Sequence, residues 1–211
     1  MAYSSGGAIW RSDVTGGPRA QVSPTPDSAT SYSAPTLSLD GRYVTYRIHR
    51  VDWNGLAVTD QTTGTTWQLI KPTEDAYDTS SASISEDGRW VAYVKNNSSV
   101  AGNAPQAYLW DRTTNASSRL TTVAYPIRIG GISVSGDGTH VSYLRYDPSS
   151  QGSSIVLVSR PDKTSRTVVS ANRPVDSTVL SRDGHHLSFC TTASNVGSGG
   201  TVAPNLYVWN G

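Results

Sequence analysis

The sequence predicts an all-β fold that is built from one repeated unit of short antiparallel strands. The first observation is a segment that the chain repeats around an Asp-Gly pair. The pairs are Asp40-Gly41, Asp87-Gly88, Asp137-Gly138 and Asp183-Gly184. They are separated by 47, 50 and 46 residues, and a period of this size is typical of repeat architectures.

The second observation is the alternation of side chains after each pair. In the first copy Val44 and Tyr46 fall on one side of the chain, while Thr45 and Arg47 fall on the other. Such alternation indicates half-buried strands, and an Asp-Gly pair supplies the positive φ of a two-residue hairpin loop. Each copy therefore predicts two strands, A and B, around a tight turn. One inward aromatic recurs, and we expect it in the core: Tyr46, Tyr93, Tyr143 and Phe189.

The third observation is a composition rich in turn residues, with 19 Gly and 11 Pro, and no long helical pattern. Two further strands, C and D, follow the hairpins around a turn rich in Thr, Gly and Asn. Four antiparallel strands every roughly 40–50 residues form the blade of a β-propeller. We therefore predict a propeller of about four to five blade equivalents.

The strands are expected in the following order within a single domain, 1–211. Residues 1–7 are predicted to be a polar, flexible start, and residues 8–23 to form strands C and D. A Ser/Thr/Pro linker, 24–34, leads to complete A-B-C-D units at 36–70, 82–121 and 131–170. The chain then continues with strands A, B and C at 177–210.

The closure of the ring is left open by this order. In one arrangement residues 18–23 supply the missing strand D of the last blade, which gives four blades and a duplicated strand C. In another the two incomplete sets belong to different blades of a larger ring, and the chain forms a partial ring. In a third, a second copy of the chain completes the ring, because unpaired edge strands invite pairing.

Composition argues against several classes of partner. The net charge is +1 and only 16% of residues are charged, which disfavours a nucleic-acid or anionic membrane surface. No apolar run approaches the ~18 residues of a membrane span, and the N-terminus lacks the pattern of a signal peptide. The one cysteine, Cys190, excludes an internal disulfide and is expected to be a small buried apolar group.

Four segments carry a resemblance to a known family. They are SLDGRYVTY, SEDGRWVAY, SGDGTHVSY and SRDGHHLSF, at 38–46, 85–93, 135–143 and 181–189. Together they resemble the PD40 or TolB-like repeat, a WD40-like β-propeller repeat of bacterial proteins. The turns DQTTG (60–64) and DRTTN (111–115) match its D-x-x-T-G pattern, and 193–205 resembles an Ala-Ser-Asn insert of actinobacterial versions. The proline that precedes the serine in that family is absent from all four copies.

The resemblance covers nearly the whole chain and implies a binding platform of an exported protein, extracellular or periplasmic. TolB-like propellers bind proteins or peptides, and related propellers gate the active sites of serine peptidases. No matching peptidase domain is present in this sequence. Because the fold hosts many functions, the resemblance is specific for fold and not for ligand.

The candidate catalytic and metal-binding residues have simpler interpretations as structural residues. The Asp-Gly aspartates are expected to be turn formers that bond their own backbone, because a calcium loop needs several converging oxygen ligands. The histidines show no zinc-site spacing: His49, His140, His185 and His186. There is no G-x-S-x-G elbow and no phosphate-binding glycine loop. We therefore expect no enzyme activity, no cofactor and no metal.

The longer B–C loops are the expected binding face, because binding residues concentrate on loops of a rigid scaffold. These loops are 50–55, 96–106, 147–153 and 193–204. Trp53 lies in a polar loop, where it either anchors a partner or stacks on a sugar, or packs between blades. The predicted binding residues are Trp53, Asn54, Asn97, Asn103, Asp147 and Asn195.

The predicted function is that of a non-catalytic β-propeller module that recognises a protein or peptide. One alternative is a glycan-binding module of a secreted protein, which would use loop aromatics such as Trp53. Another is a substrate-gating propeller that belongs to a larger hydrolase or peptidase.

Overall fold

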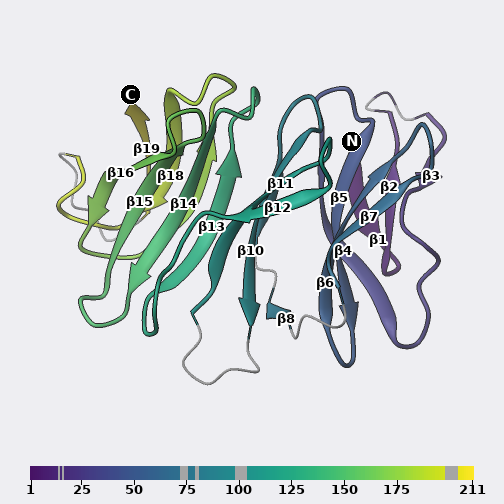
Figure 1. Cartoon of the computed structure of the whole chain (residues 1–211), viewed down its shortest axis with the longest axis horizontal. Helices are drawn as coiled ribbons and strands as arrows, with labels where there is room; N and C mark the ends of the chain where they lie inside the picture. The colour runs from purple at the N-terminus through teal and green to yellow at the C-terminus, as the bar shows by residue number, and fades with distance from the viewer. Residues whose placement is uncertain (14, 16, 72–75, 79–80, 98–103, 198–203) are drawn as a thin grey trace.

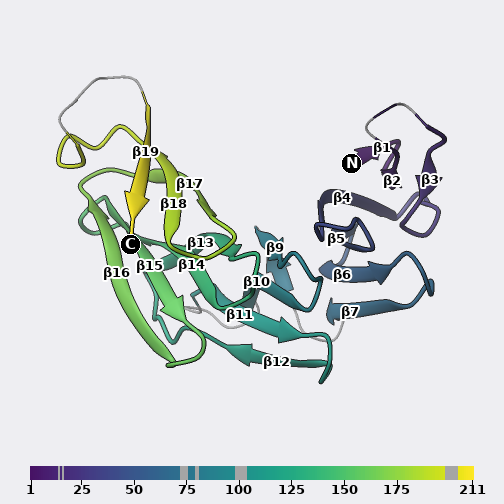
Figure 2. The ribbon, with the colours of Figure 1, turned by 90° about the horizontal axis from the view of Figure 1, so that it is seen from above.

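The computed structural model describes residues 1–13, 15, 17–71, 76–78, 81–97, 104–197 and 204–211, with the backbone alone for 76–78 and 97. These residues form five antiparallel sheets that follow one another in chain order along an open arc (Figures 1 and 2). No helix occurs in the described ranges, so none there has the length and apolar character to cross a membrane. The all-β prediction is confirmed, and the sheets do not close into a ring.

The three middle sheets are complete blades with strands A to D side by side. The first blade holds β4 (Thr30–Leu37), β5 (Tyr43–Arg50), β6 (Asn54–Asp60) and β7 (Thr66–Ile70). In the second, β8 (Ala76–Asp78) and β9 (Ala82–Ile84) both pair with β10 (Trp90–Asn97), followed by β11 (Gln106–Asp111) and β12 (Ala116–Arg119). The third holds β13 (Arg128–Val134), β14 (His140–Asp147), β15 (Gly152–Ser159) and β16 (Thr164–Ala171).

The predicted linker at 24–34 is too long. Strand β4 begins at Thr30 and pairs with β5 along its length, from Thr30 opposite Arg50 to Leu37 opposite Val44. Its register shifts between Ser33 and Thr36, and Ala34 takes a φ of 49°. This bulge interrupts the alternation of side chains, and the first half of the strand is polar. Both features give the segment the sequence pattern of a linker.

Each end of the arc carries a three-stranded sheet. The N-terminal sheet holds β1 (Ala2–Ser5), β2 (Ala8–Arg11) and β3 (Ala20–Gln21), and the C-terminal sheet holds β17 (Val175–Leu180), β18 (His186–Thr191) and β19 (Asn205–Asn210). The two sheets lie at opposite ends of the chain of blades (Figure 2). The N-terminal sheet corresponds to strands B, C and D, and the C-terminal sheet to strands A, B and C.

The prediction of a flexible N-terminus is wrong, and one of the arrangements left open for the ring is excluded. Residues 2–5 are not a flexible start, because all four pair with β2 across a two-residue turn. Gly6 and Gly7 have φ values of 58° and 74°, the geometry that a type I′ hairpin turn requires. Residues 18–23 do not complete the last blade either, because β3 within this segment pairs with β2. The four-blade closure is thereby excluded for this structure.

The four repeated turns differ from the predicted two-residue loop. In the first, β4 ends at Leu37 and β5 begins at Tyr43, so five residues connect them. Gly41 has a φ of 69° and its N–H donates to the Ser38 carbonyl at 2.9 Å, which makes Gly41 the last residue of a four-residue S-x-D-G turn. The Ser38 hydroxyl donates to Asp40 Oδ1 at 2.6 Å and accepts from the Tyr43 N–H at 2.9 Å.

Each turn aspartate bonds its own backbone two residues on. Asp40 accepts from the N–H of Arg42, and Asp87 from that of Arg89, at 3.0 and 2.9 Å. The third and fourth turns repeat this with Asp137 and Asp183. The serine hydroxyl is the main cause that lowers the pKa of Asp40. These bonds make the Asp-Gly turns local structural units.

Neighbouring blades meet through a ring packed on a glycine. At Gly88 an added Cβ would lie 2.1 Å from the ring of Tyr43, and at Gly138 it would lie 2.2 Å from the ring of Trp90. His140 packs in the same way on Gly184. The S-x-D-G turns are also joined in a row, since Leu39 N donates to Glu86 O at 2.9 Å and Glu86 N to Gly136 O at 2.9 Å.

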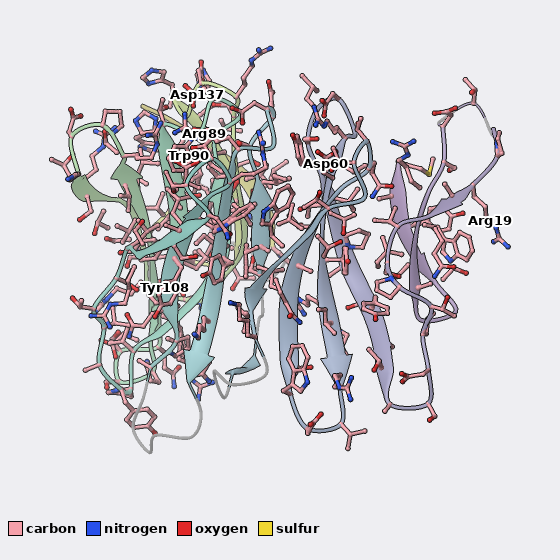
Figure 3. All side chains as sticks on the ribbon, turned by 45° about the vertical axis from the view of Figure 1, so that its right-hand side comes forward. Arg19, Asp60, Arg89, Trp90, Tyr108 and Asp137 are labelled. Carbon is pink, nitrogen blue, oxygen red and sulfur yellow. The ribbon has the colours of Figure 1, made fainter. Side chains whose placement is uncertain are left out.

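Two arginines lie against each of the first two rings. Arg42 and Arg112 lie over Tyr43 with their Cζ atoms 5.0 and 4.3 Å from the ring centre. Arg89 and Arg160 lie over Trp90 at 4.6 and 4.1 Å. One arginine of each pair comes from the next blade, so cation–π contact adds to the junction. Figure 3 shows Arg89, Trp90 and Asp137 close together at the upper edge of the sheets.

Two of the arginines also join the A–B turn to the C–D turn of their own blade. Arg42 donates from Nε and Nη2 to the two oxygens of Asp60 at 2.9 and 2.7 Å, and Arg89 binds Asp111 in the same way at 3.0 and 2.9 Å. These bonds lower the pKa of Asp111 to about 2 and hold the pKa of Asp60 well below its usual range.

The glycine contacts generate a matched test. Gly41 and Gly88 share a repeat position and a similar φ, of 69° and 66°, but an added Cβ meets nothing within 4 Å at Gly41 and the Tyr43 ring at Gly88. We expect Gly41→Ala to lower the free energy of unfolding by about 1 kcal/mol through backbone strain. Gly88→Ala should cost roughly 2–4 kcal/mol, because the ring must also move. Urea denaturation measures both, and equal losses would contradict the role of ring packing.

The ion pairs predict a loss of stability in acid. A carboxylate whose folded pKa is depressed stabilises the fold above its unfolded pKa and loses that effect as pH falls through its folded pKa. For Asp111 the window runs from about pH 4 down to about pH 2. We expect Asp111→Asn to lower the free energy of unfolding at pH 7 by about 1 kcal/mol, since Arg89 is partly exposed, and to reduce the acid dependence.

The control for this measurement is Asp52, which pairs with Arg50 at 3.6 Å with its side chain 74% exposed. Asp52→Asn should leave the denaturation midpoint unchanged both at pH 7 and within the acid window. An Asp111→Asn protein with the same acid dependence as the parent chain would show that this ion pair does not stabilise the blade.

Candidate functional site

A cavity of about 440 Å³ lies on the face of the first blade that packs against the N-terminal sheet. Strands β4 to β7 supply its floor and one side. The segment between β3 and β4, and Trp53 in the loop between β5 and β6, supply the rest. Its volume falls within the range of small-ligand pockets, and an apolar floor with a polar margin is typical of such pockets. It is the candidate site.

The cavity follows from one small residue in the repeat. In each blade the inward aromatic of strand B pairs with a residue of strand C. The pairs are Tyr46 with Ala57, Tyr93 with Tyr108, Tyr143 with Val156 and Phe189 with Tyr207. The second and last pairs involve stacked rings with centroids 5.5 Å apart. The first blade has Ala57 at that position, so no strand C ring stacks on Tyr46 there, and Ala57 lines the cavity instead.

Two buried tyrosines form the floor. Tyr32 and Tyr46 meet edge to face with centroids 5.7 Å apart. The Tyr46 hydroxyl bonds to the Thr59 hydroxyl at 3.0 Å, and Thr59 bonds on to Thr66 at 2.9 Å. Burial raises the pKa of Tyr32 and of Tyr46. Both phenols are therefore neutral at physiological pH, and Ile48 and Ala57 complete a floor without charge.

The margin carries one charge of each sign. Asp27 lies on the segment before β4, and its Oδ1 accepts from the Ala29 N–H at 2.8 Å. That bond is the main cause that lowers the pKa of Asp27, so its carboxylate is ionised at neutral pH. Arg50, at the end of β5, pairs with Asp52 at 3.6 Å. A ligand at this margin meets a donor and an acceptor.

Trp53 forms one wall of the cavity. Its carbonyl accepts from the Arg50 N–H at 2.9 Å, which closes the short loop between β5 and β6. Its ring covers Gly55, where an added Cβ would lie 2.2 Å from the indole. The side chain is half-buried, so it both packs in the fold and offers surface to the cavity.

The other predicted binding residues do not gather around this cavity. Asn54 bonds to His49 Nδ1 at 3.1 Å, and Asp147 accepts from the N–H of Ser149 within its own turn at 2.9 Å. Asn195 Oδ1 accepts a hydrogen bond from the Asn172 N–H at 2.9 Å. Asn103 and the side chain of Asn97 lie outside the described residues.

Several residues of the cavity were absent from the prediction. Asp27 and Tyr32 fall in the segment that was interpreted as a linker, and Ala57 is an unremarkable residue of a strand. The sequence did contain a signal, because Ala57 departs from the larger residues at the same repeat position. In the described part of the chain, no three His, Cys, Asp or Glu side chains gather as a metal site.

Comparison with known proteins gives a fold and no family. No protein-family model matches the sequence, and no curated protein matches it. Solved structures do match: TolB from Acinetobacter baumannii has a TM-score of 0.65 at 15% identity, over 96% of this chain and 46% of that one. The fold is a TolB-like β-propeller.

Two further structures support this. An oligogalacturonate lyase in complex with manganese matches with a TM-score of 0.71 at 17% identity, over 99% of this chain and 58% of that one. The β-propeller domain of the Trilobed protease from Pyrococcus furiosus, which has an open velcro topology, matches with a TM-score of 0.65 at 12% identity, over 87% and 56%. The chain thus spans about half the length of these relatives, and at such identities the likeness shows the fold alone.

Proposed function

We propose that this TolB-like propeller is a non-catalytic binding module that recognises a protein or peptide by taking one apolar side chain into the Ala57 cavity. The observation that supports this most directly is the floor of Tyr32, Tyr46, Ile48 and Ala57 beneath a margin with Asp27 and Arg50. A large apolar side chain would fill the floor, while the margin would bond the polar backbone beside it.

The electrostatics of the cavity favour binding over proton transfer. The pKa of Asp27 is lowered, and those of Tyr32 and Tyr46 are raised. All three shifts lead away from neutrality, whereas a general acid or base works best with a pKa near the working pH. The hydroxyl of Tyr46 is already bonded to Thr59, so the floor favours an apolar group over a hydroxylated one.

Two other functions have a specific observation in their favour. Trp53 lines the cavity together with the polar Thr66 and Gln68. This favours a glycan ligand, because an indole face and polar groups together suit a sugar ring. The similarity to the propeller domain of a protease favours a gating role within a larger hydrolase. We further propose that the repeat is of the bacterial PD40 type and that the protein is exported, on the strength of the four S-x-D-G segments.

A displayed-peptide library tests the leading proposal. The parent chain should enrich peptides that share one aromatic or large aliphatic residue, with affinity measured by tryptophan fluorescence. Ala57→Tyr would restore the ring pair of Tyr93 and Tyr108 and fill the cavity. We expect it to weaken binding of those peptides at least about tenfold, a loss of about 1.4 kcal/mol, with no loss of stability.

Two controls accompany this experiment. Ala57→Val reproduces the residue of the third blade and should weaken binding less, and it replaces Ala57→Tyr if the larger ring overpacks the fold. Leu39→Tyr adds a ring at a site that is 70% exposed and should not change binding. Equal binding by the Ala57 variants, or quenching of tryptophan fluorescence by oligosaccharides alone, would refute the peptide proposal.

A further inference from the structure

The outward face of the C-terminal sheet exposes apolar residues at repeat positions that the other blades bury. Val208 is 62% exposed, whereas its equivalents Val58, Leu109 and Leu157 are 0%, 3% and 4% exposed. Leu206 is 70% exposed, whereas its equivalents Leu56, Ala107 and Ile155 are at most 1% exposed. The equivalence follows from pairing with strand B, because Val208 pairs with Ser188 as Leu157 pairs with Ser142.

Three of the four junctions within the chain show what covers this face. Leu56 and Val58 pack on Tyr93 and Trp110 of the second blade. Ala107 and Leu109 pack on Tyr143 and Val156 of the third blade, and Ile155 and Leu157 pack on Phe189 of the C-terminal sheet. In every case the forward face of one sheet meets the aromatic face of the next, so the face around Val208 is suited to an aromatic sheet face.

The N-terminal sheet presents such a face at the other end of the arc. Its Ile9 packs toward the first blade, so strand alternation directs Tyr3 and Trp10 to the opposite side. Tyr3 pairs with Trp10 across strands B and C, as Tyr93 pairs with Tyr108 in the second blade. The N-terminal sheet therefore carries a pair of rings on one face, like the aromatic face of the second blade. Both side chains are half-buried, and Figure 2 shows both end sheets beside the opening of the arc.

We infer that the chain associates head to tail, with the Val208 face of one copy docked on the Tyr3–Trp10 face of a second copy. This junction continues the series of contacts that already join the five sheets of the chain. A contact between two different surfaces gives a closed ring or an open series of copies, according to the rotation between them.

Two details of these faces, and one internal junction, fit such a contact. Arg19 lies over Trp10 with its Cζ 4.5 Å from the ring centre, at the margin of the N-terminal sheet (Figure 3). Within the chain Arg166 of the third blade lies over Trp209 of the next sheet at 5.2 Å, so an arginine is compatible with a packed junction. Val179 replaces the serine that accepts a hydrogen bond at Ser83 and Ser133, which makes the terminal face more apolar.

Complementation between two surface variants tests this directly. Val208→Asp removes the forward face and leaves Tyr3 and Trp10 intact, while Tyr3→Asp does the reverse. We expect the parent chain to show species heavier than 22.5 kDa in light scattering as its concentration rises. Each variant alone should be monomeric, with its dissociation constant raised at least about tenfold by the carboxylate in an apolar contact. An equimolar mixture should form a dimer, because one intact face of each kind remains.

The controls separate this proposal from its alternatives. Val51→Asp places the same charge at a residue that is 88% exposed and should associate like the parent chain. Trp10→Ala replaces Tyr3→Asp if the latter lowers the denaturation midpoint. A parent chain that stays monomeric at every concentration would overturn the inference. So would a Tyr3→Asp protein that still dimerises by itself, because that result indicates a symmetric contact between two C-terminal sheets.

Discussion

The structure depends on the contact between a ring at the start of strand B and the glycine of the next S-x-D-G turn. Tyr43, Trp90 and His140 each occupy the space that a Cβ would take at Gly88, Gly138 and Gly184. The same glycines have φ values between 66° and 72°, which favour glycine on backbone grounds alone. Two independent requirements therefore meet in one residue of each repeat. The arginines and the row of backbone hydrogen bonds add further contacts between neighbouring blades.

Features that are candidates for function occur where the repeat departs from its pattern, or where a repeated face has no neighbouring sheet among the described residues. Ala57 stands where the other blades have Tyr108, Val156 and Tyr207, and the missing volume becomes the cavity beside Trp53. Val208 and Leu206 follow the pattern, but no further sheet covers them among the described residues. A regular scaffold makes such departures visible, since each position can be compared with its equivalents in the same chain. Departures from the locally favoured residue are expected at functional sites, where binding and not stability selects the side chain.

The cavity and the end faces are built from the same kinds of side chain but differ in shape and charge. Both are aromatic and aliphatic surfaces of blades, but the cavity is enclosed on several sides and has a charged margin, whereas the end faces are open sheet surfaces. Enclosure suits a single side chain or small ligand, and an open apolar sheet face suits another sheet. One arc can therefore offer a ligand site within the first blade and association surfaces at its ends without competition between them.

The sequence by itself determined the repeat, the all-β class and the place of each S-x-D-G turn, because these depend on local alternation and on the glycine of each turn. It also singled out Trp53. Only the tertiary structure decided that residues 2–5 form a strand, that β4 begins at Thr30, and that β3 pairs with β2. Those outcomes depend on which edge finds a partner, and polar segments such as these carry little local information. The cavity needed the fold as well, since Asp27, Tyr32 and Ala57 meet only when β4 and β6 lie on either side of β5.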